Sequence, residues 1–271
     1  MRGTSAASLA TVQAGFEPVL RTAKRNAALL GGQLFAVVDA LTSSGSLRRA
    51  LSDPSRSGDD KAALVRGVLG STADKRVVHV VEEFARSRWT SDADLIDAIE
   101  EVAADAVLAS AQAAGTLQTV EEEIFRFERV LIGQRELRRA LTDRSAPADS
   151  RATLVAALLK GKAEPSTVQL ISRAAFAPRG RTMAAMLERM VRLAARRREL
   201  LVASVTAASP LSDAQRNRLE ASLERAYGRA VQLSVAVDPR VIGGMKVQVG
   251  AHVVDSTTLG RLEDVRRRLA G

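Results

Sequence analysis

The run LSVAVDPRVIGGMKVQVGAHVVDSTTLGRLEDVRRRLA, which covers residues 233–270, decides how the end of the chain folds. Apolar residues alternate with small or polar ones over residues 233–237 and again over residues 245–249. A period of two places the apolar side chains on one face of a sheet. Asp238-Pro239 and Gly243-Gly244 separate the two stretches with residues that favour turns. The run therefore predicts two strands joined by a short connection.

Further elements are predicted on both sides of these strands. Upstream, residues 200–207 alternate as a strand does, and Ser212 with Gln215 forms a capping box for a helix that runs through Tyr227. Downstream, a closing helix is predicted because apolar residues recur every three or four positions, at Leu259, Leu262, Val265 and Leu269. Residues 199–271 are therefore predicted to form a small domain that mixes strands and helices.

An internal repeat organises the rest of the chain. The heptapeptide LRRALSD at residues 47–53 returns as LRRALTD at residues 137–143, an offset of 137 − 47 = 90 residues. Apolar positions match at the same offset on both sides of the heptapeptide, as Leu64 does with Leu154. Matching apolar positions over such a length predict the same helices packing in the same way twice.

Each copy is predicted to hold two helices, the short helix of the heptapeptide, and two more helices after a polar turn. The helix that follows the polar turn is expected to start near Asp59 or Asp149, each placed as an N-cap. The bounds expected for the longer helices are 5–25, 32–43 and 73–88 in the first copy, and 92–114, 118–132 and 164–177 in the second.

The predicted fold class is mainly α with a small α+β C-terminal domain, that is, tandem helical bundles followed by a small mixed strand and helix domain. Apolar residues make up 46% of the chain and aromatic residues only 3%, so alanine, leucine and valine must form the core. That composition favours helix. We expect an extra helical bundle over residues 1–90, a second bundle with a connecting helix over residues 91–198, and the small domain over residues 199–271.

Two features near the end of the second bundle have a structural and a functional interpretation. Pro178-Arg179-Gly180-Arg181 is typical of a helix end followed by a turn, and the alternative is a phosphate-binding corner. The stripe that follows is typical of core packing, and the alternative is an adaptable groove for a partner. It consists of Met183, Met186, Leu187, Met190 and Leu193.

The formal charge is +9, from 40 basic and 31 acidic residues. The ordinary interpretation is a solvated surface of mixed charge. The alternative function is a basic helical nucleic-acid-binding protein, attracted to phosphate by the arginines of residues 179–198 and 266–268. No aromatic residue lies among those arginines, so base stacking is poorly supported.

No constellation of residues predicts catalysis. The two histidines are isolated, His79 in an apolar helix face and His252 beside a tight strand connection. Gly161-Lys162 lacks the other residues of a phosphate-binding loop. The absence of cysteine excludes disulfides and thiolate ligands. We therefore expect no enzyme, no cofactor, and no catalytic or metal-binding residue.

The sequence also predicts no direct insertion into a membrane. No apolar signal-peptide segment follows the first residues. The most apolar run, residues 27–38, is interrupted by two glycines and a glutamine and is too short to span a bilayer. Membrane association is therefore expected only through a partner.

The C-terminal run resembles the signature of the delta subunit of F-type ATP synthases, the family that includes the mitochondrial oligomycin-sensitivity-conferring protein. Five pieces carry the resemblance: DP at residues 238–239, IGG at 242–244, VQVG at 247–250, VVD at 253–255 and GRLE at 260–263. The chain departs from the family at Ser256-Thr257-Thr258-Leu259, where a Gly-Ser-Val-Arg type of run is usual. The motif positions expected to be structural are Asp238, Pro239, Gly243, Gly244, Gly250, Asp255, Gly260, Arg261 and Leu262.

The resemblance covers roughly residues 92–271 and implies a mechanical role. In this family the helical domain binds N-terminal helices of the alpha subunits of the catalytic head, and the C-terminal domain binds the end of the b-type stalk subunit. Such a subunit resists rotor torque at the cytoplasmic face of the cell membrane and binds no nucleic acid. The motif does not indicate which residues contact either partner.

The extra copy over residues 1–89 departs from the length usual in the family. It could strengthen the grip on the head, contact the stalk, or brace the second copy. Head binding is expected in residues 92–177, because this copy adjoins the C-terminal domain as in the family.

Overall fold

The computed structural model describes residues 3–143, 145–199, 201–227, 231–239, 241, 244–249 and 252–255. The chain divides into two compact units, Met1–Arg197 and Arg198–Gly271. The first unit is helical and the second holds a sheet with a helix, so the predicted fold class is confirmed.

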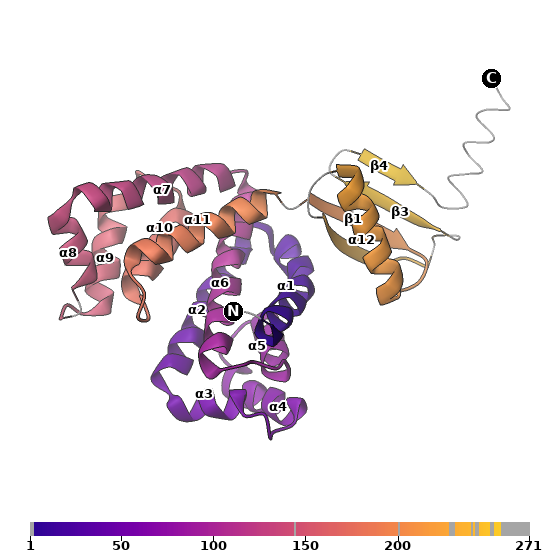
Figure 1. The fold of residues 1–271 in the computed structure, drawn as a ribbon, viewed down its shortest axis with the longest axis horizontal. Coiled ribbons are helices and arrows are strands. Elements are labelled where there is room, and N and C mark those ends of the chain that lie inside the picture. Colours follow the sequence, from indigo (N-terminus) through magenta and orange to yellow (C-terminus); the bar gives the residue numbers. More distant parts are fainter. Residues whose placement is uncertain are drawn as a thin grey trace. The chain divides into compact units, whose positions relative to one another are not determined.

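The first unit is built of helices, labelled in Figure 1. The first copy of the repeat supplies α1 (Thr4–Ala23), a 3-10 turn (Lys24–Asn26), α2 (Ala27–Ser43), α3 (Gly45–Ser52), α4 (Gly58–Leu69) and α5 (Lys75–Arg86). Next come α6 (Asp92–Ala114), α7 (Leu117–Gly133), α8 (Arg135–Thr142), α9 (Ala148–Leu159), α10 (Pro165–Phe176) and α11 (Met183–Glu199).

The repeat is confirmed helix by helix. Helices α2 to α5 begin at residues 27, 45, 58 and 75, and α7 to α10 begin at residues 117, 135, 148 and 165, with equal lengths in each pair. Side-chain contacts repeat as well. In the first copy Gln33 Oε1 accepts a hydrogen bond from the backbone N–H of Asp74 at 2.8 Å. In the second copy Glu123 Oε2 accepts one from the backbone N–H of Glu164 at 3.0 Å.

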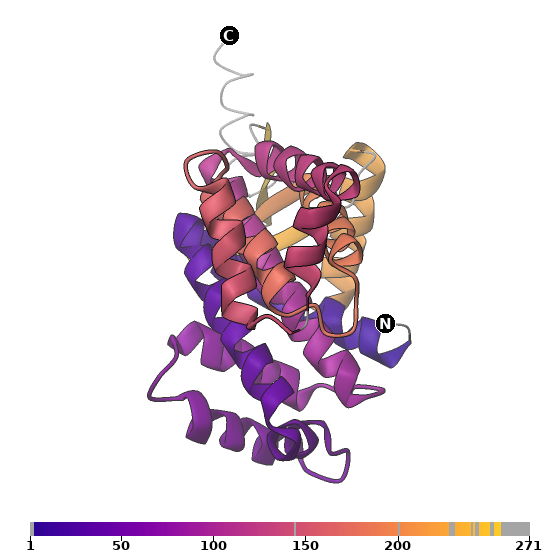
Figure 2. The same ribbon diagram turned by 90° about the vertical axis from the view of Figure 1, so that its left-hand side faces the viewer.

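Helix α6 is shared by both copies. It packs against α1, α2 and α5 on the first-copy side and against α7 and α10 on the second-copy side. The crossing with α2 is close, because a Cβ at Gly31 would lie 2.7 Å from the carbonyl oxygen of Ala103 and 2.8 Å from Cγ2 of Val107. The copies therefore share one hydrophobic core, and the predicted division at residue 90 falls inside a single compact unit. Figure 2 shows the first-copy helices, indigo to purple, beside and below those of the second copy, pink to orange.

The methionine stripe of α11 belongs to this core, which confirms the structural interpretation of its spacing. Each of its five side chains is at most 4% exposed. Unbranched methionines fill the irregular space between α11 and the helices beneath it. The buried stripe thus places one face of α11 in the core of the helical unit.

Two predicted helix caps are wrong. The N-cap of α4 lies two residues earlier than expected, because the hydroxyl of Ser57 accepts from the backbone N–H of Asp60 at 3.1 Å and caps the helix. Pro147 occupies the N-cap position of α9. Asp59 and Asp149 lie instead within the first turns, where their negative charge still favours the helix dipole.

The second unit is a four-stranded sheet in the order β2-β1-β3-β4 with one helix against it. Strand β1 (Leu201–Ala207) runs parallel to β2 (Val231–Val237), and α12 (Asp213–Tyr227) makes the crossover that parallel strands need. Strand β3 (Met245–Val249) pairs antiparallel with both β1 and β4 (His252–Asp255). Leu219 and Leu223 of α12 pack on the core of the sheet.

The sequence predicted most of this unit. Both strands of the C-terminal run are present, and the capping box is confirmed: Ser212 N donates to Gln215 Oε1 at 2.9 Å, and Gln215 N donates to Ser212 Oγ at 3.3 Å. Strand β4 was not predicted, because its four residues are too few to show alternation. The closing helix predicted from Leu259 to Leu269 lies outside the described residues.

Among the described residues, no single helix is both long and apolar enough to cross a membrane. Residues 4–43 taken together with residues 45–52 pass the same test of length and composition, but the two parts are bent by 104°.

Candidate functional site

The described motif residues of the second unit lie in its turns and strand ends. Asp238 follows β2, where its backbone N–H donates to the carbonyl oxygen of Ala207 at 3.0 Å and its own carbonyl accepts from Val241 N at 3.0 Å. Gly244 has φ +75°, a conformation that favours glycine, directly before β3. Asp255 pairs in register with Lys246 at the end of β4.

These contacts fit the structural role expected of the motif, because they shape the connection between two strands. Pro239 follows Asp238 in the same turn and is exposed. The other positions lie outside the described residues: Gly243, Gly250, Gly260, Arg261 and Leu262.

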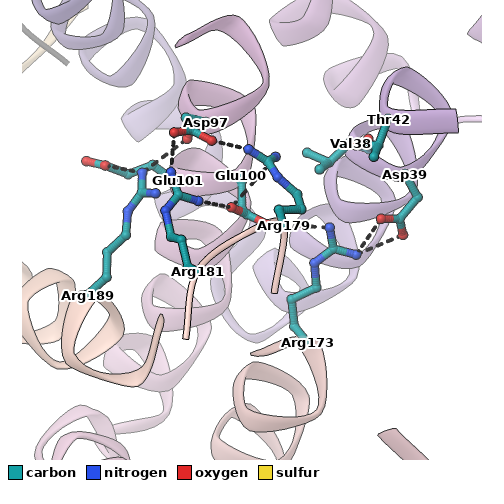
Figure 3. Close-up of polar contacts among 10 residues, drawn as sticks. All are labelled: Val38, Asp39, Thr42, Asp97, Glu100, Glu101, Arg173, Arg179, Arg181 and Arg189. Carbon is teal, nitrogen blue, oxygen red and sulfur yellow. Dashed lines mark hydrogen bonds and ion pairs between the residues drawn. The ribbon is translucent and has the colours of Figure 1, made fainter. Parts of the chain in front are cut away.

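A dense ionic network joins α6 to the turn after α10 and to α11, as Figure 3 shows. Asp97 contacts both Arg179 and Arg181. Glu100, whose side chain is 4% exposed, lies 3.4 Å from Arg181 and 3.5 Å from Arg173 of α10. Carboxylates at positions 97, 100, 101 and 105 share one side of α6, since residues three and four apart are neighbours on a helix.

The network continues along α11. Glu101 contacts Arg189 at 2.7 Å and Arg196 at 2.8 Å, and Asp105 contacts Arg197 at 2.8 Å. Burial opposes ionisation of Glu101, but these two arginines outweigh it and hold the pKa of that carboxyl below its usual value. Glu101 is therefore charged at neutral pH and fixes two arginines of the basic run.

This geometry decides between the two interpretations of Pro178-Arg179-Gly180-Arg181, a helix end followed by a turn or a phosphate-binding corner. Arg179 and Arg181 turn toward the carboxylate of Asp97, so carboxylates of α6 occupy the place that a phosphate would need. Burial also lowers the pKa of Arg179, in keeping with a side chain enclosed by the fold. The corner after α10 is a structural turn, as its sequence predicted.

The described residues contain no group of three or more metal-ligating side chains close enough to hold an ion. His79 was expected in an apolar helix face, and that is wrong: it lies on the exposed side of α5, between the buried residues Val78 and Val80.

A groove of about 600 Å³ opens on the second copy. Helices α7 and α8 form one side of it, and the turn after α10 with the start of α11 forms the other. Its apolar lining includes Ile132, Ala174 and Met183, and its cationic lining includes Arg135, Arg138 and Arg139. An apolar floor with a charged rim is the kind of surface that accepts an amphipathic helix.

Helix α7 adds exposed apolar surface next to this groove. Phe125, Val130 and Ile132 are 49%, 47% and 68% exposed. The first-copy counterpart of Phe125 is Phe35, which is buried under the guanidinium of Arg173 at 4.8 Å. In the first copy, this face of α2 is covered by the second copy. The equivalent face of α7 is exposed, which makes the second copy the better candidate for binding a partner.

Comparison with known proteins identifies the family. The model of the family "ATP synthase delta (OSCP) subunit" matches residues 99–269. The chain belongs to the ATP synthase delta (OSCP) subunit family. It is 52% identical over 271 residues to the ATP synthase subunit delta of Beutenbergia cavernae, covering 100% of both chains. It is 47% identical over 269 residues to that of Kineococcus radiotolerans, and 43% identical over 270 residues to that of Streptomyces coelicolor. Coverage is 99% and 100% of this chain and 98% of each relative.

The family match confirms the resemblance drawn from the C-terminal motif. The OSCP family model begins within α6, so it covers the second copy and the second unit and leaves the first copy outside. The delta subunits of the three relatives nevertheless align over almost the whole chain, so these relatives share the long form. Nothing in these matches supports the nucleic-acid alternative.

Proposed function

We propose that this chain is a non-catalytic peripheral stalk subunit that links the catalytic head of an F-type proton-translocating ATP synthase to its membrane-anchored b-type stalk. The observation that carries the proposal is the family match, which spans the second copy and the second unit and extends to full-length relatives named ATP synthase subunit delta. As a member of this family, the chain is a structural part of the ATP synthase stator. It works at the cytoplasmic face of the cell membrane, peripheral to it and held there through the complex.

The fold suits a part that must resist torque. A stator deforms little only if its helices cannot slide past one another, and buried ion pairs of defined geometry oppose such sliding. Here α6 is fixed to α10, to the turn after it and to α11 by the carboxylate and arginine network. The chain forms and breaks no bond in the reaction; it keeps the head from turning with the rotor.

The two partners are assigned to different parts of the chain. Residues 91–198 bind N-terminal helices of the alpha subunits, and the groove and the open face of α7 support this assignment. Residues 199–271 bind the end of the b-type subunit. Strand β2 is an edge strand of their sheet, and Val237 at its end is 48% exposed. The first copy braces the second, since α2 packs on α6.

Binding of the full chain to each partner tests this function. We expect the purified chain to bind both an ATP synthase head depleted of its delta-type subunit and a b-type subunit. The Phe125→Asp variant should bind the head more weakly and the b-type subunit normally, and the Val237→Asp variant should do the reverse. Each substitution places a charge on the exposed apolar surface assigned to one partner. A chain that binds neither component, or that binds DNA tightly at physiological salt, would refute the proposal.

A further inference from the structure

One position of the repeat recurs in three helices of the first unit. Residues 17, 107 and 197 are spaced by the repeat offset, since 107 − 17 = 90 and 197 − 107 = 90, and they lie in α1, α6 and α11. In the middle helix the residue is Val107, which is 0% exposed. The two outer helices carry opposite charges there, and Nη2 of Arg197 donates to both carboxylate oxygens of Glu17. The first and the last helix of the unit are therefore bonded to each other at equivalent positions.

The last turn of α11 depends on charge more than on apolar packing. The apolar face of this helix ends in the core with Leu193 and Ala194, which are 4% and 0% exposed. Among the described side chains of α11 beyond them, only Arg197 is buried. Arg196 contacts the carboxylate of Glu101, but its side chain is 62% exposed, and exposed ion pairs contribute little. The end of the helix is therefore held mainly through Arg197.

Two carboxylates bind Arg197, one from the shared helix and one from the first copy. Its Nη1 donates to Asp105 of α6 at 2.8 Å, and its Nη2 donates to Glu17 of α1 at 3.0 Å. The OSCP family model starts at residue 99, so it includes Arg197 and Asp105 and leaves Glu17 outside. Charge-assisted contacts that use both oxygens of a carboxylate are among the strong polar contacts of proteins. The extra copy thus adds such a contact to an arginine that the shared helix binds through one oxygen.

This arginine lies where the chain leaves the helical unit. Helix α11 ends at Glu199, β1 begins at Leu201, and the boundary of the two units falls directly after Arg197. A pull on the second unit therefore reaches the helical unit along the backbone at the end of α11. Helix ends with few buried apolar contacts open at low cost in free energy. The hold on Arg197 thus decides whether this end stays wound.

We propose that the first copy clamps the end of α11: Glu17 holds Arg197 in place and keeps the last turn of the helix from unwinding. The purpose of the clamp rests on the proposed function, because the pull comes from a stalk bound to the second unit. The contact itself and its effect on α11 belong to this chain alone. The clamp gives the extra copy a task that the packing of α2 on α6 does not perform.

Hydrogen exchange of the purified full chain, followed by mass spectrometry without any partner, tests the clamp. Glu17→Gln removes the charge with little change in shape. We expect the amides of residues 196–199 to exchange about tenfold faster, because the charge-assisted hydrogen bonds no longer oppose local opening. Amides of residues 34–41, in the middle of α2, open only with the whole unit. They should stay protected over the same time, which shows that the variant is folded.

Two other variants of the first copy are the controls. Glu83→Gln makes the same chemical change at a pair within α5, where the carboxylate lies 2.8 Å from Arg86. Arg21→Gln removes the neighbour of Glu17 within α1, 3.4 Å away, and keeps the contact with Arg197. Each control should change exchange at residues 196–199 by less than about twofold. If Glu83→Gln speeds exchange there as much as Glu17→Gln does, the effect is one of general stability and the clamp is refuted.

Glu17→Asp keeps the proposal testable should Glu17→Gln fail to fold. The negative charge stays beside Arg197, so the fold is kept, but the side chain is one methylene shorter and loses the contact through both oxygens. Exchange at residues 196–199 should then be about threefold faster than in the wild type. Wild-type exchange at this end in every folded Glu17 variant would overturn the inference. The proposed function would still stand, because binding to the head and to the b-type subunit is measured separately.

Discussion

Arg197 in α11 donates to both carboxylate oxygens of Glu17 in α1 at 3.0 Å, although 180 residues separate them. The same guanidinium contacts Asp105 of α6 at 2.8 Å. The side chains of Arg197 and Glu17 are 4% and 8% exposed. One arginine therefore ties the first and last helices of the helical unit to the helix they share.

Removing this arginine should destabilise the helical unit strongly. Arg197→Ala leaves two enclosed carboxylates without their main counter-charge, which costs about 3–5 kcal/mol for a buried pair. Urea denaturation followed by helical circular dichroism measures the loss. Arg192→Ala breaks only an exposed pair with Glu188 and should cost less than about 1 kcal/mol. Equal losses in the two variants would show that the buried cluster adds nothing to stability.

The close crossing of α2 and α6 gives a second prediction. Gly31→Ala places a methyl group against the backbone of Ala103 and the side chain of Val107, so the helices must move apart, at a cost of about 1–3 kcal/mol. At Gly32 the nearest atom is Nε2 of Gln169, at 3.4 Å and on a flexible side chain. Gly32→Ala should therefore be neutral or stabilising by up to about 1 kcal/mol, because alanine favours helix. Thermal melts of both variants measure the difference, and a Gly31→Ala chain that melts no lower than Gly32→Ala would contradict it.

The aromatic pair of the first copy gives a third. Phe84→Ala removes a ring buried to 1% exposure and should cost about 3–5 kcal/mol. Trp89 is the only tryptophan of the chain and lies against that ring, so its fluorescence should shift toward that of an exposed indole. Phe125→Ala, at an exposed ring of α7, should change stability by about 0.5 kcal/mol or less. An unshifted tryptophan spectrum in Phe84→Ala would argue against the packing described.

Much of the fold follows from local patterns in the sequence. The repeat was visible because burial of the same helix faces keeps the same apolar positions, as Leu64 and Leu154 show. Helix ends were predicted less well. Ser57 caps α4 in place of Asp59, because two acceptors lie within one turn and only one of them fits the geometry.

The ionic network was not predicted, because its members lie far apart in the chain. Asp97 meets Arg181 across 84 residues, and only the packed fold brings the two together. The groove did leave a signal in the sequence. Aligning the copies at the 90-residue offset sets Ala174 against Phe84 and Thr182 against Asp92, and both Ala174 and Thr182 line the groove. Comparing the copies for their differences would have revealed what comparing them for similarity did not.

The last prediction concerns acid and the N-cap of α5. Hydrogen bonds from the side chain and the backbone of Arg76 lower the pKa of Asp74 from 3.8 to about 2. The unfolded chain therefore binds a proton at this carboxyl more readily than the folded chain does, and the stability that the carboxylate contributes is lost as pH falls from about 4 to about 2. Asp74→Asn keeps an oxygen that accepts from the backbone N–H of Arg76 but removes the charge.

At neutral pH Asp74→Asn should be less stable than the wild type by up to about 1 kcal/mol, and the difference should shrink toward zero below about pH 2. Asp74→Ala also removes the cap and should stay about 1 kcal/mol below the wild type even in acid. Urea denaturation at a series of pH values measures both differences. A gap between wild type and Asp74→Asn that is constant across this range would mean that the Asp74 carboxylate is not stabilised by folding.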